Sequence, residues 1–343
     1  MRIARRGLLA MSALALSSGA AKAATVAAAV HPALSPATAP PPTSAPAKVE
    51  VPLWPTGSME TPPKGLSERS AGGLVGVTAP RLEIFRPPAH LDRGRAMLVV
   101  PGGGYERLVL DNEGYGMARF LTEHGITAGV LVYRLPGEGW KSGPEAPLQD
   151  AVRGMRLMRS LAPGWKVDPE KIGVVGFSSG GHLAGLLTTR NHTHAYAPID
   201  AVDALPARPA FAGLIYPVID LATTSERMAS RHSLFGETAS AEQIAAWSVE
   251  KFVTSATPPC FLVHAADDPI VPPENSLIMY RALIQAKAHA ELHLFGHGGH
   301  GFGLVANATA TAWPDLFLKW AEAHGLGKEG LIEESRAARA VPA

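Results

Sequence analysis

The segment IGVVGFSSGGHLAGLL, from Ile172 to Leu187, decides how this sequence folds. Its first half is an apolar run typical of a strand that is buried on both faces of a parallel sheet. Glycines then flank Ser178, and a stretch of helical character follows. A strand, a tight turn and a helix in this order fit the G-x-S-x-G pattern, in which a serine on a strained turn exposes its hydroxyl above the sheet. The segment therefore predicts that Ser178 is a nucleophile at the end of a central strand.

Strand-like runs and amphipathic stretches alternate on both sides of this segment. The alternation continues over roughly 250 residues, which predicts an α/β fold with helices on both faces of a mostly parallel central sheet. Helical spacing of apolar residues is clearest from Leu148 to Met158 and from Trp313 to Trp320. The expected strands are Leu82–Phe85, Ala96–Val100, Thr127–Tyr133, Lys171–Val175, Phe211–Tyr216, Cys260–His264 and Glu291–Phe295.

The composition is that of a folded globular protein. Of the 343 residues, 46% are hydrophobic and 18% are charged, and the net charge is +1. Because the body of the chain has no basic block, we expect no nucleic-acid partner. Cys260 is the only cysteine, which excludes an internal disulfide, and its apolar surroundings predict a buried residue. Nothing in the sequence specifies an oligomeric state.

The first residues differ from the rest of the chain. An arginine-rich start precedes a short apolar run that begins at Leu8, and small residues follow around Ala23. This pattern predicts a signal peptide over residues 1–23, and the pair Arg5 and Arg6 resembles a twin-arginine export signal. The alternative, an uncleaved membrane anchor, requires a longer apolar run. We therefore expect a periplasmic or secreted protein without stable membrane insertion.

A segment rich in Ala, Pro, Ser and Thr follows, and it predicts a linker over residues 24–50. The folded domain is expected over residues 51–343, with no further segment long and apolar enough to be a transmembrane helix. Within the domain, residues 223–257 interrupt the regular alternation. We expect an insertion there that covers the active site.

A glycine triplet, Gly102 to Gly104, follows the strand that is expected to end at Val100. Consecutive glycines let the backbone approach a ligand and turn its N–H groups inward. The triplet lies one strand–helix–strand–helix unit before Ser178, where enzymes with such a serine place the N–H groups that bind an oxyanion. A flexible turn is the alternative. The N–H of Ser179, which follows the nucleophile, is expected to contribute to the same site.

Candidates for an acid and a base follow two later strands. Asp267 and Asp268 come at the end of an apolar run, and either of them can be a turn residue before the next proline. His297 and His300 lie in a glycine-rich loop after another strand. The order of serine, aspartate and histidine along the chain is that of α/β-hydrolases and not of the other serine hydrolase folds.

Several motifs together resemble one known family. They include PGGGY, GFSSGGHLA, GGHGFG and the HxxxDxxVP pattern that starts at His264. With VPLWPTG, EGYGMARFL, YRLP and APLQDAVR, they are similar to the acetyl xylan esterase and feruloyl esterase-like group of α/β-hydrolases. That group is related to hormone-sensitive-lipase-type esterases. The similarity runs from about Val51 to Trp320.

The resemblance implies the α/β-hydrolase fold and a role for each matching residue. Ser178 is implied to be the nucleophile, Asp268 the acid and His300 the base. The oxyanion hole is implied to consist of N–H groups from Gly103, Gly104 and Ser179. No cofactor is implied.

The resemblance also implies an activity. It points to an exported serine carboxylesterase that acts on a small-molecule or oligosaccharide ester and removes acetyl groups from xylan-type oligosaccharides through an acyl-enzyme. A feruloyl esterase and a general short-chain carboxylesterase are the alternatives on the same fold. An inactive binding protein is the alternative from another class, although no member of the serine, aspartate and histidine set is missing.

Other polar residues have less specific interpretations. Tyr105 follows the glycine triplet and is expected to flank the acyl group of a substrate. His182 lies near Ser178 in sequence, but its position on the following helix favours a packing role over that of the base. Glu113 and Arg134 are expected either to brace the pocket or to form a buried ion pair.

Asp150 begins a charged series on its helix, and these residues are expected to form a solvated face or to lie at helix ends. The arginines of the series are Arg153, Arg156 and Arg159. No metal is expected, because the histidines lack a cysteine or carboxylate cluster at zinc spacing. The histidines considered as ligands are His192, His194, His297 and His300.

Overall fold

The computed structural model describes residues 48–190, 195–223, 229–304 and 309–326. The expected signal peptide, nearly all of the expected linker, and the pair His192 and His194 lie outside these residues. The expected export signal therefore stays a prediction.

Eight strands form one sheet, and two more form a separate hairpin-like pair. In order across the main sheet they are β1 (Lys48–Pro52), β4 (Arg81–Phe85), β6 (Ile126–Val132), β5 (Arg95–Val100), β7 (Gly173–Phe177), β8 (Ala212–Ile215), β9 (Cys260–Ala265) and β10 (Ala290–Phe295). The six strands from β6 to β10 run parallel, while β4 is antiparallel to both of its neighbours. The separate pair consists of β2 (Arg69–Ser70) and β3 (Leu74–Val75). The prediction of a mostly parallel central sheet is confirmed.

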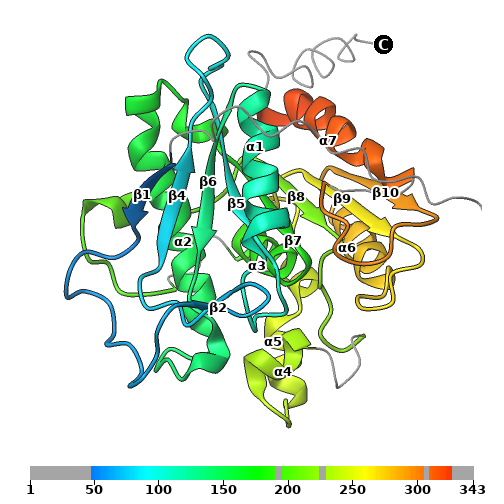
Figure 1. The fold of residues 1–343 in the computed structure, drawn as a ribbon. Helices are drawn as coiled ribbons and strands as arrows, with labels where there is room; N and C mark the ends of the chain where they lie inside the picture. The colour runs from blue at the N-terminus through cyan, green and yellow to red at the C-terminus, as the bar shows by residue number, and fades with distance from the viewer. Residues whose placement is uncertain (1–47, 191–194, 224–228, 305–308, 327–343) are drawn as a thin grey trace, which may run out of the picture. The chain divides into compact units, whose positions relative to one another are not determined.

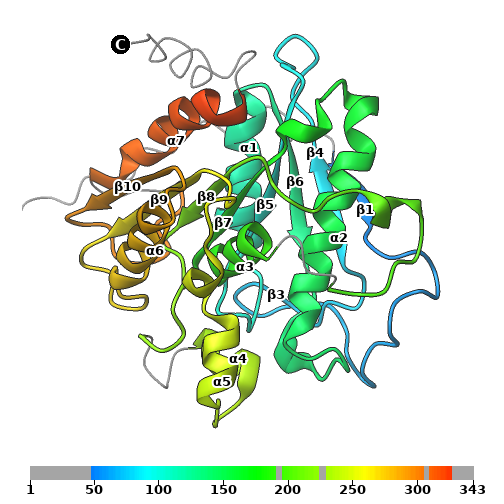
Figure 2. The ribbon, with the colours of Figure 1, turned by 180° about the vertical axis from the view of Figure 1, so that it is seen from behind.

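Seven α-helices occur in the described part of the chain. They are α1 (Gly116–Glu123), α2 (Glu145–Leu161), α3 (Ser178–Thr189), α4 (Ala229–Phe235), α5 (Ala241–Trp247), α6 (Glu274–Gln285) and α7 (Trp313–Ala321). Figures 1 and 2 show α1 and α7 on one face of the sheet and α2, α3 and α6 on the other. None of the described helices has the length and apolarity needed to cross a bilayer.

Short helical turns connect these elements. Single 3-10 turns occur at Pro136–Glu138, Ala162–Trp165, Pro169–Lys171, Ala201–Ala204, Val249–Phe252 and Thr309–Ala312, and π-helical turns at Leu110–Tyr115 and Glu322–Leu326. The strands β6 and β7 are buried along their whole length, as expected for strands covered by helices on both faces. Because parallel strands end at the same edge of a sheet, the loops after β5, β7, β8, β9 and β10 meet there.

All seven expected strands are present, and the sequence missed three others. β1 begins at Lys48, inside the segment expected to be a linker up to residue 50, and it pairs antiparallel with β4 at the edge of the sheet. Four of its five residues are exposed, so it lacks the buried apolar face that reveals a strand in sequence. The short strands β2 and β3 lie in a segment without apolar periodicity. The expected domain boundary at residue 51 is therefore three residues too late for the sheet.

The arginines of α2 do not form the solvated face that their spacing suggested. Arg153 and Arg156 are less than a tenth exposed, and both donate to the buried carboxylate of Asp203. Arg159 is equally buried and pairs with Glu170. The expectation of a solvated face was wrong, because the partners come from segments 11 to 50 residues away in the chain, beyond the reach of helical periodicity. Arg159 does lie in the last turn of α2, as the alternative of a helix-end position has it.

Arg134 and Asp150 form the centre of a buried network at the end of β6. The Asp150 carboxylate, which has no exposed surface, accepts hydrogen bonds from the guanidinium of Arg134, at 2.8 Å for its shortest bond, and from Nε1 of Trp54 at 2.8 Å. The guanidinium lies over the rings of Trp54 and Trp140, 5.4 and 5.3 Å from their centroids. Of the two alternatives for Arg134, the structure therefore supports the buried ion pair, which ties the segment before β4 to the sheet.

Asp150→Asn is expected to destabilise the fold by about 3 kcal/mol, because it leaves a buried guanidinium without its bidentate partner. Urea unfolding at pH 7 measures this loss. Glu106→Gln is the matched control, since Glu106 pairs with Arg107 on the surface and its loss should cost less than about 1 kcal/mol. Equal effects of the two substitutions would contradict the assignment of Asp150 as a buried anchor.

Candidate active site

Ser178 lies on the turn between β7 and α3, as the sequence predicts. Its φ angle is +51°, a left-handed conformation that is strained for a residue with a side chain. The flanking glycines are required here, because a Cβ on Gly176 would overlap the backbone of Gly180, and a Cβ on Gly180 would overlap the carbonyl of Val100. The tight turn thus holds the serine at the carboxyl edge of the sheet and at the start of a helix, whose dipole favours negative charge.

The structure brings Ser178, His300 and Asp268 into one hydrogen-bonded chain. The Oγ of Ser178 lies 2.9 Å from Nε2 of His300, and Nδ1 of His300 lies 2.7 Å from Oδ2 of Asp268. Since a carboxylate only accepts, Nδ1 carries a proton and Nε2 is free to accept from the serine hydroxyl. This arrangement can remove a proton from the serine and hold the resulting imidazolium.

The geometry distinguishes the two adjacent aspartates. Asp268 is buried, and its Oδ1 accepts from the backbone N–H groups of Ile270 and Val271, each at 2.9 Å. Burial alone would raise the pKa of Asp268, but hydrogen bonds from His264 and His300 outweigh it and hold the pKa well below its usual value. The carboxylate that contacts His300 is therefore charged.

Asp267 has a different position and function in the same loop. Its side chain is exposed, and its Oδ1 accepts from the N–H groups of Gly298 and Gly299 at 2.9 and 2.8 Å. These glycines immediately precede His300. Asp267 thus braces the histidine loop, and the structure gives it no contact with the imidazole of His300.

His264 is a partner of Asp268 that sequence reasoning treated only as part of a motif. Its Nε2 lies 3.3 Å from Oδ2 of Asp268 and 3.0 Å from the carbonyl of Val271, and its Nδ1 lies 2.7 Å from Oγ of Ser276. The ring has no exposed surface. His264 therefore fixes the loop that carries Asp268, and the fixed spacing of the HxxxDxxV pattern is the sequence signal of this contact.

The glycine triplet lies directly beside the nucleophile. A Cβ on Gly102 would stand 2.9 Å from Cβ of Ser178, so only glycine allows this approach. Gly103 and Gly104 both have positive φ angles, +126° and +69°. Among the described residues, no acceptor takes a hydrogen bond from either of their N–H groups. These two N–H groups lie in the loop after β5, and the N–H of Ser179 lies in the first turn of α3, directly after the nucleophile candidate.

Tyr105 does not lie where the sequence suggested. Its side chain is 1% exposed, and its hydroxyl donates to Nδ1 of His182 at 2.8 Å, so it cannot flank an acyl group. The Nε2 of His182 in turn donates to the carbonyl of Trp247 at 2.8 Å. The prediction for Tyr105 was wrong because its left-handed backbone, with φ of +60°, turns the side chain into the core. His182 has the packing role that was predicted.

The insertion over residues 223–257 contains α4 and α5, which lie near the carboxyl edge of the sheet (Figure 1). A Cβ on Gly104 would come within 2.9 Å of Cβ of Ala229, the first residue of α4. Residues 224–228 lie outside the described part. The insertion thus borders the glycine loop, and its action as a lid stays a prediction.

Burial lowers the pKa of His182 to about 4, so the folded protein holds this ring neutral. The unfolded chain takes up the proton near pH 6.5, so stability is complete above that pH and decreases as the pH falls toward 4. We expect protonation of His182 in the unfolded chain to lower the free energy of unfolding by up to about 3 kcal/mol at pH 4. Urea unfolding measures the free energy of unfolding at pH 7 and at pH 4. The decrease between the two pH values should be smaller for His182→Gln than for the wild type. Equal losses would contradict the assignment.

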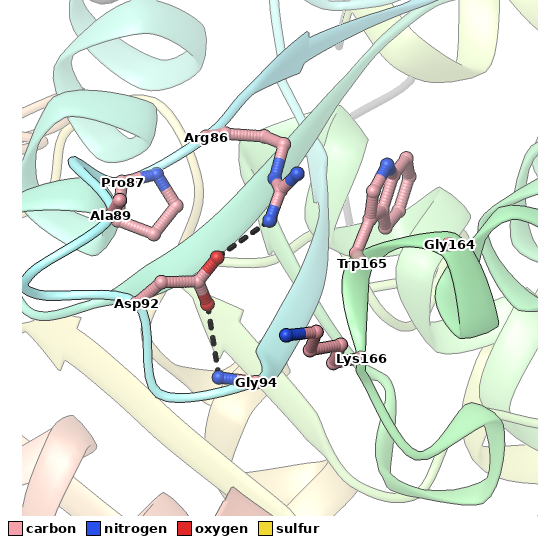
Figure 3. A pocket seen from close by; sticks show the side chains of 8 residues that line it. All are labelled: Arg86, Pro87, Ala89, Asp92, Gly94, Gly164, Trp165 and Lys166. Atoms are coloured by element: carbon pink, nitrogen blue, oxygen red, sulfur yellow. Dashed lines mark hydrogen bonds and ion pairs between the residues drawn. The ribbon is translucent and has the colours of Figure 1, made fainter.

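A surface cavity of about 490 Å³ lies at the opposite edge of the sheet (Figure 3). Its wall contains Gly94, which directly precedes β5, whereas the glycine triplet follows the other end of that strand. Arg86 and Asp92 form an ion pair of 2.6 Å on one side, and Trp165 and Lys166 face them. The length of the strand separates this cavity from Ser178.

In the described residues, no group of histidine, cysteine and carboxylate side chains could hold a metal ion.

The fold and the site define the class of protein. A mostly parallel sheet, a serine on a strained strand–helix turn, and an aspartate and histidine on the loops after β9 and β10 are the features of an α/β-hydrolase. Residues 82–283 match the BD-FAE family, and the chain belongs to this family of esterase-type α/β-hydrolases.

Two curated proteins show the similarity in sequence. An acetylxylan esterase of Xylanibacter ruminicola is 33% identical over 214 residues, which are 61% of this chain and 41% of that protein. Endo-1,4-beta-xylanase B of Butyrivibrio fibrisolvens is 31% identical over 222 residues, 63% of this chain and 34% of that protein. The chain therefore spans less than half the length of these two relatives.

Two solved structures show the similarity in three dimensions. An acetyl ester-xyloside bifunctional hydrolase from Caldicellulosiruptor lactoaceticus is 34% identical with a TM-score of 0.70, and the match covers 82% of this chain and 98% of that one. Carboxylesterase Cest-2923 from Lactobacillus plantarum is 28% identical with a TM-score of 0.60, over 76% and 98% of the two chains. The α/β-hydrolase fold predicted from the sequence is confirmed.

Proposed function

We propose that this protein is a serine carboxylesterase that removes acetyl groups from xylan-type oligosaccharides. One observation carries the reaction type: the hydrogen-bonded chain from Ser178 through His300 to Asp268, at 2.9 and 2.7 Å, next to a glycine loop whose Gly103 and Gly104 N–H groups have no acceptor within the described part of the chain. The names of the relatives support the substrate class.

The proposed reaction proceeds in two stages. His300 takes the hydroxyl proton of Ser178 at Nε2 while the serine oxygen attacks the ester carbonyl, and Asp268 stabilises the imidazolium. The N–H groups of Gly103, Gly104 and Ser179 bind the oxyanion, and each such donor contributes about 3 kcal/mol in comparable sites. His300 then protonates the leaving alcohol. Water, deprotonated by His300, attacks the acyl-enzyme, and the carboxylic acid leaves as Ser178 regains its proton.

Export is part of the proposal. The arginine-rich start, the short apolar run and the small residues around Ala23 support a cleaved signal, and the pair Arg5 and Arg6 supports the twin-arginine route. The mature protein is then periplasmic or secreted and begins at Ala24. N-terminal sequencing of the protein from a membrane-free extracytoplasmic fraction tests this, and an intact Met1 there would contradict it.

The activity is tested in two steps. Mass spectrometry after treatment with a serine-directed phosphonate should find one adduct, on Ser178, and its absence would favour a non-catalytic binding protein. Hydrolysis is then compared across p-nitrophenyl esters from acetate to octanoate and across acetylated and feruloylated xylo-oligosaccharides. Preference for acetylated xylo-oligosaccharides supports the proposal, whereas preference for feruloylated or longer acyl esters would assign the site to the alternatives.

A further inference from the structure

Glu113 is a buried carboxyl group that the proposed reaction does not use. It lies in the π-helical turn between the glycine loop and α1, and its residue is 3% exposed. No lysine or arginine of the described residues interacts with it, so the ion pair suggested by the sequence is absent there. A buried carboxylate without a cationic partner is costly, and such groups are concentrated at functional sites.

Both oxygens of Glu113 accept hydrogen bonds from residues at the active site. Oε2 accepts from the N–H of Gly102 at 2.7 Å, and Oε1 accepts from the hydroxyl of Tyr216 at 3.0 Å. The Tyr216 oxygen in turn accepts from the N–H of Gly303 at 3.0 Å, so its own proton is directed at Glu113. Both of these partners of the carboxyl group are donors, as a carboxylate requires.

These contacts connect the two loops of the proposed site. Gly102 begins the glycine triplet, and Gly303 lies three residues after His300. Tyr216 bridges them from the end of β8, where it has a strained φ of +37° and lies with its ring 5.1 Å from that of His300 in an edge-to-face arrangement. A non-glycine residue in this conformation is maintained only where its surroundings demand it.

The charged and titratable groups around Glu113 come from four loops. Tyr216 and Tyr133 are neutral. His300 is the histidine that interacts with Glu113, and it also contacts Asp268, whose carboxylate His264 contacts in turn. Burial raises the pKa of Glu113 above its ordinary value, and hydrogen bonds from Gly102 and Tyr216 and the charge of His300 oppose this rise without cancelling it. Electrostatic interaction is mutual, so a charged Glu113 also favours the protonated imidazole.

We propose that Glu113 is a positioning residue of the active site: it holds the oxyanion loop against the histidine loop through Gly102 and Tyr216, and its charge stabilises the imidazolium of His300. The inference rests on the proposed function. Glu113 touches no reacting atom. It acts through its hydrogen bond to the backbone of Gly102 and through the electrostatic effect of its charge on the imidazole of His300.

Glu113→Gln tests both parts of the proposal. An amide offers one acceptor oxygen and no charge, so one of the two buried links is lost. We expect kcat for p-nitrophenyl acetate to fall by roughly 10²-fold with KM changed less than about threefold, since misplaced groups affect the transition state most. The acid limb of kcat/KM should move to lower pH by about half a unit or more, because the imidazolium is less stabilised. Glu106→Gln, an exposed glutamate of the neighbouring turn, should change neither.

Two outcomes overturn the inference in a folded Glu113→Gln protein. One is a wild-type kcat, and the other is a lower kcat with an unmoved acid limb, which is the pattern of a purely structural residue. If Glu113→Gln does not fold, Tyr216→Phe decides instead, because it keeps the charge and removes the bridge to Gly303. It should lower kcat about tenfold with KM unchanged, and a wild-type kcat overturns the proposal.

Phosphonate labelling of Ser178 separates this inference from the proposed function. A wild-type protein that is neither labelled nor active contradicts the function itself. A labelled and active wild type beside an unaffected Glu113→Gln contradicts the role of Glu113 alone. In support of that role, the rate of labelling should also be lower in Glu113→Gln, because phosphonylation needs the same oxyanion loop.

Discussion

Ser178→Ala is expected to lower kcat for any ester substrate by about 10⁶-fold, the loss seen when the nucleophile of a serine hydrolase is removed. The reason is that, among the described residues, no other hydroxyl donates to the ring nitrogens of His300: its Nε2 contacts Ser178, and its Nδ1 contacts Asp268. Steady-state kinetics with p-nitrophenyl acetate, at enzyme concentrations high enough to detect residual turnover, provide the measurement.

A second variant at this position serves as a structural control. Ser178→Gly removes the same hydroxyl and also relieves the positive φ angle, which glycine adopts without strain. It should be as inactive as the alanine variant but more stable, by about 1 kcal/mol in urea unfolding. Activity above one per cent of the wild type in either protein would contradict the assignment of the nucleophile.

Asp268→Asn is expected to lower kcat by roughly 10⁴-fold while the protein stays folded. The asparagine oxygen can still accept from Ile270 and Val271, but its amide group then faces the protonated Nδ1 of His300. Two donors cannot share this contact, so the imidazole changes tautomer, and Nε2 carries the proton that it should accept from Ser178.

Asp267→Asn is the matched control for this experiment. Both backbone bonds from Gly298 and Gly299 end on the same oxygen of Asp267, and an asparagine oxygen can accept both. We expect kcat within about tenfold of the wild type, since this residue acts only on the loop. If Asp267→Asn alone abolished turnover, the acid would have been assigned to the wrong aspartate.

Much of this site could be predicted from the sequence because its main signals are local. The apolar run before Gly176 predicts a buried strand, and the small residues around Ser178 predict a tight turn, since a Cβ at either glycine would overlap backbone. The order of Ser178, Asp268 and His300 along the chain, on strands that end at one edge, then indicates which loops meet.

Other parts could not be predicted, because they depend on which distant segments come together. Tyr105 was expected at the substrate, yet its backbone conformation directs it to His182 on another element. The arginines of α2 were expected on a solvated face or at helix ends, and their carboxylate partners on separate loops could not be read from the helix itself. Glu113 begins the motif EGYGMARFL, but that motif does not show its partners, and its proposed role follows from its contacts with Gly102 and Tyr216.

The sequence by itself determined the α/β architecture, the position of the nucleophile and the set of candidate residues, because apolar periodicity and glycine act over a few neighbouring positions. The resemblance favoured Asp268 over Asp267, and only the tertiary structure showed that Asp268 contacts His300 while Asp267 contacts the backbone of the same loop. It also decided which charges are buried and how they are paired. Those choices depend on distances between loops far apart in the chain, and such distances exist only once the sheet has brought the ends of its strands to one edge.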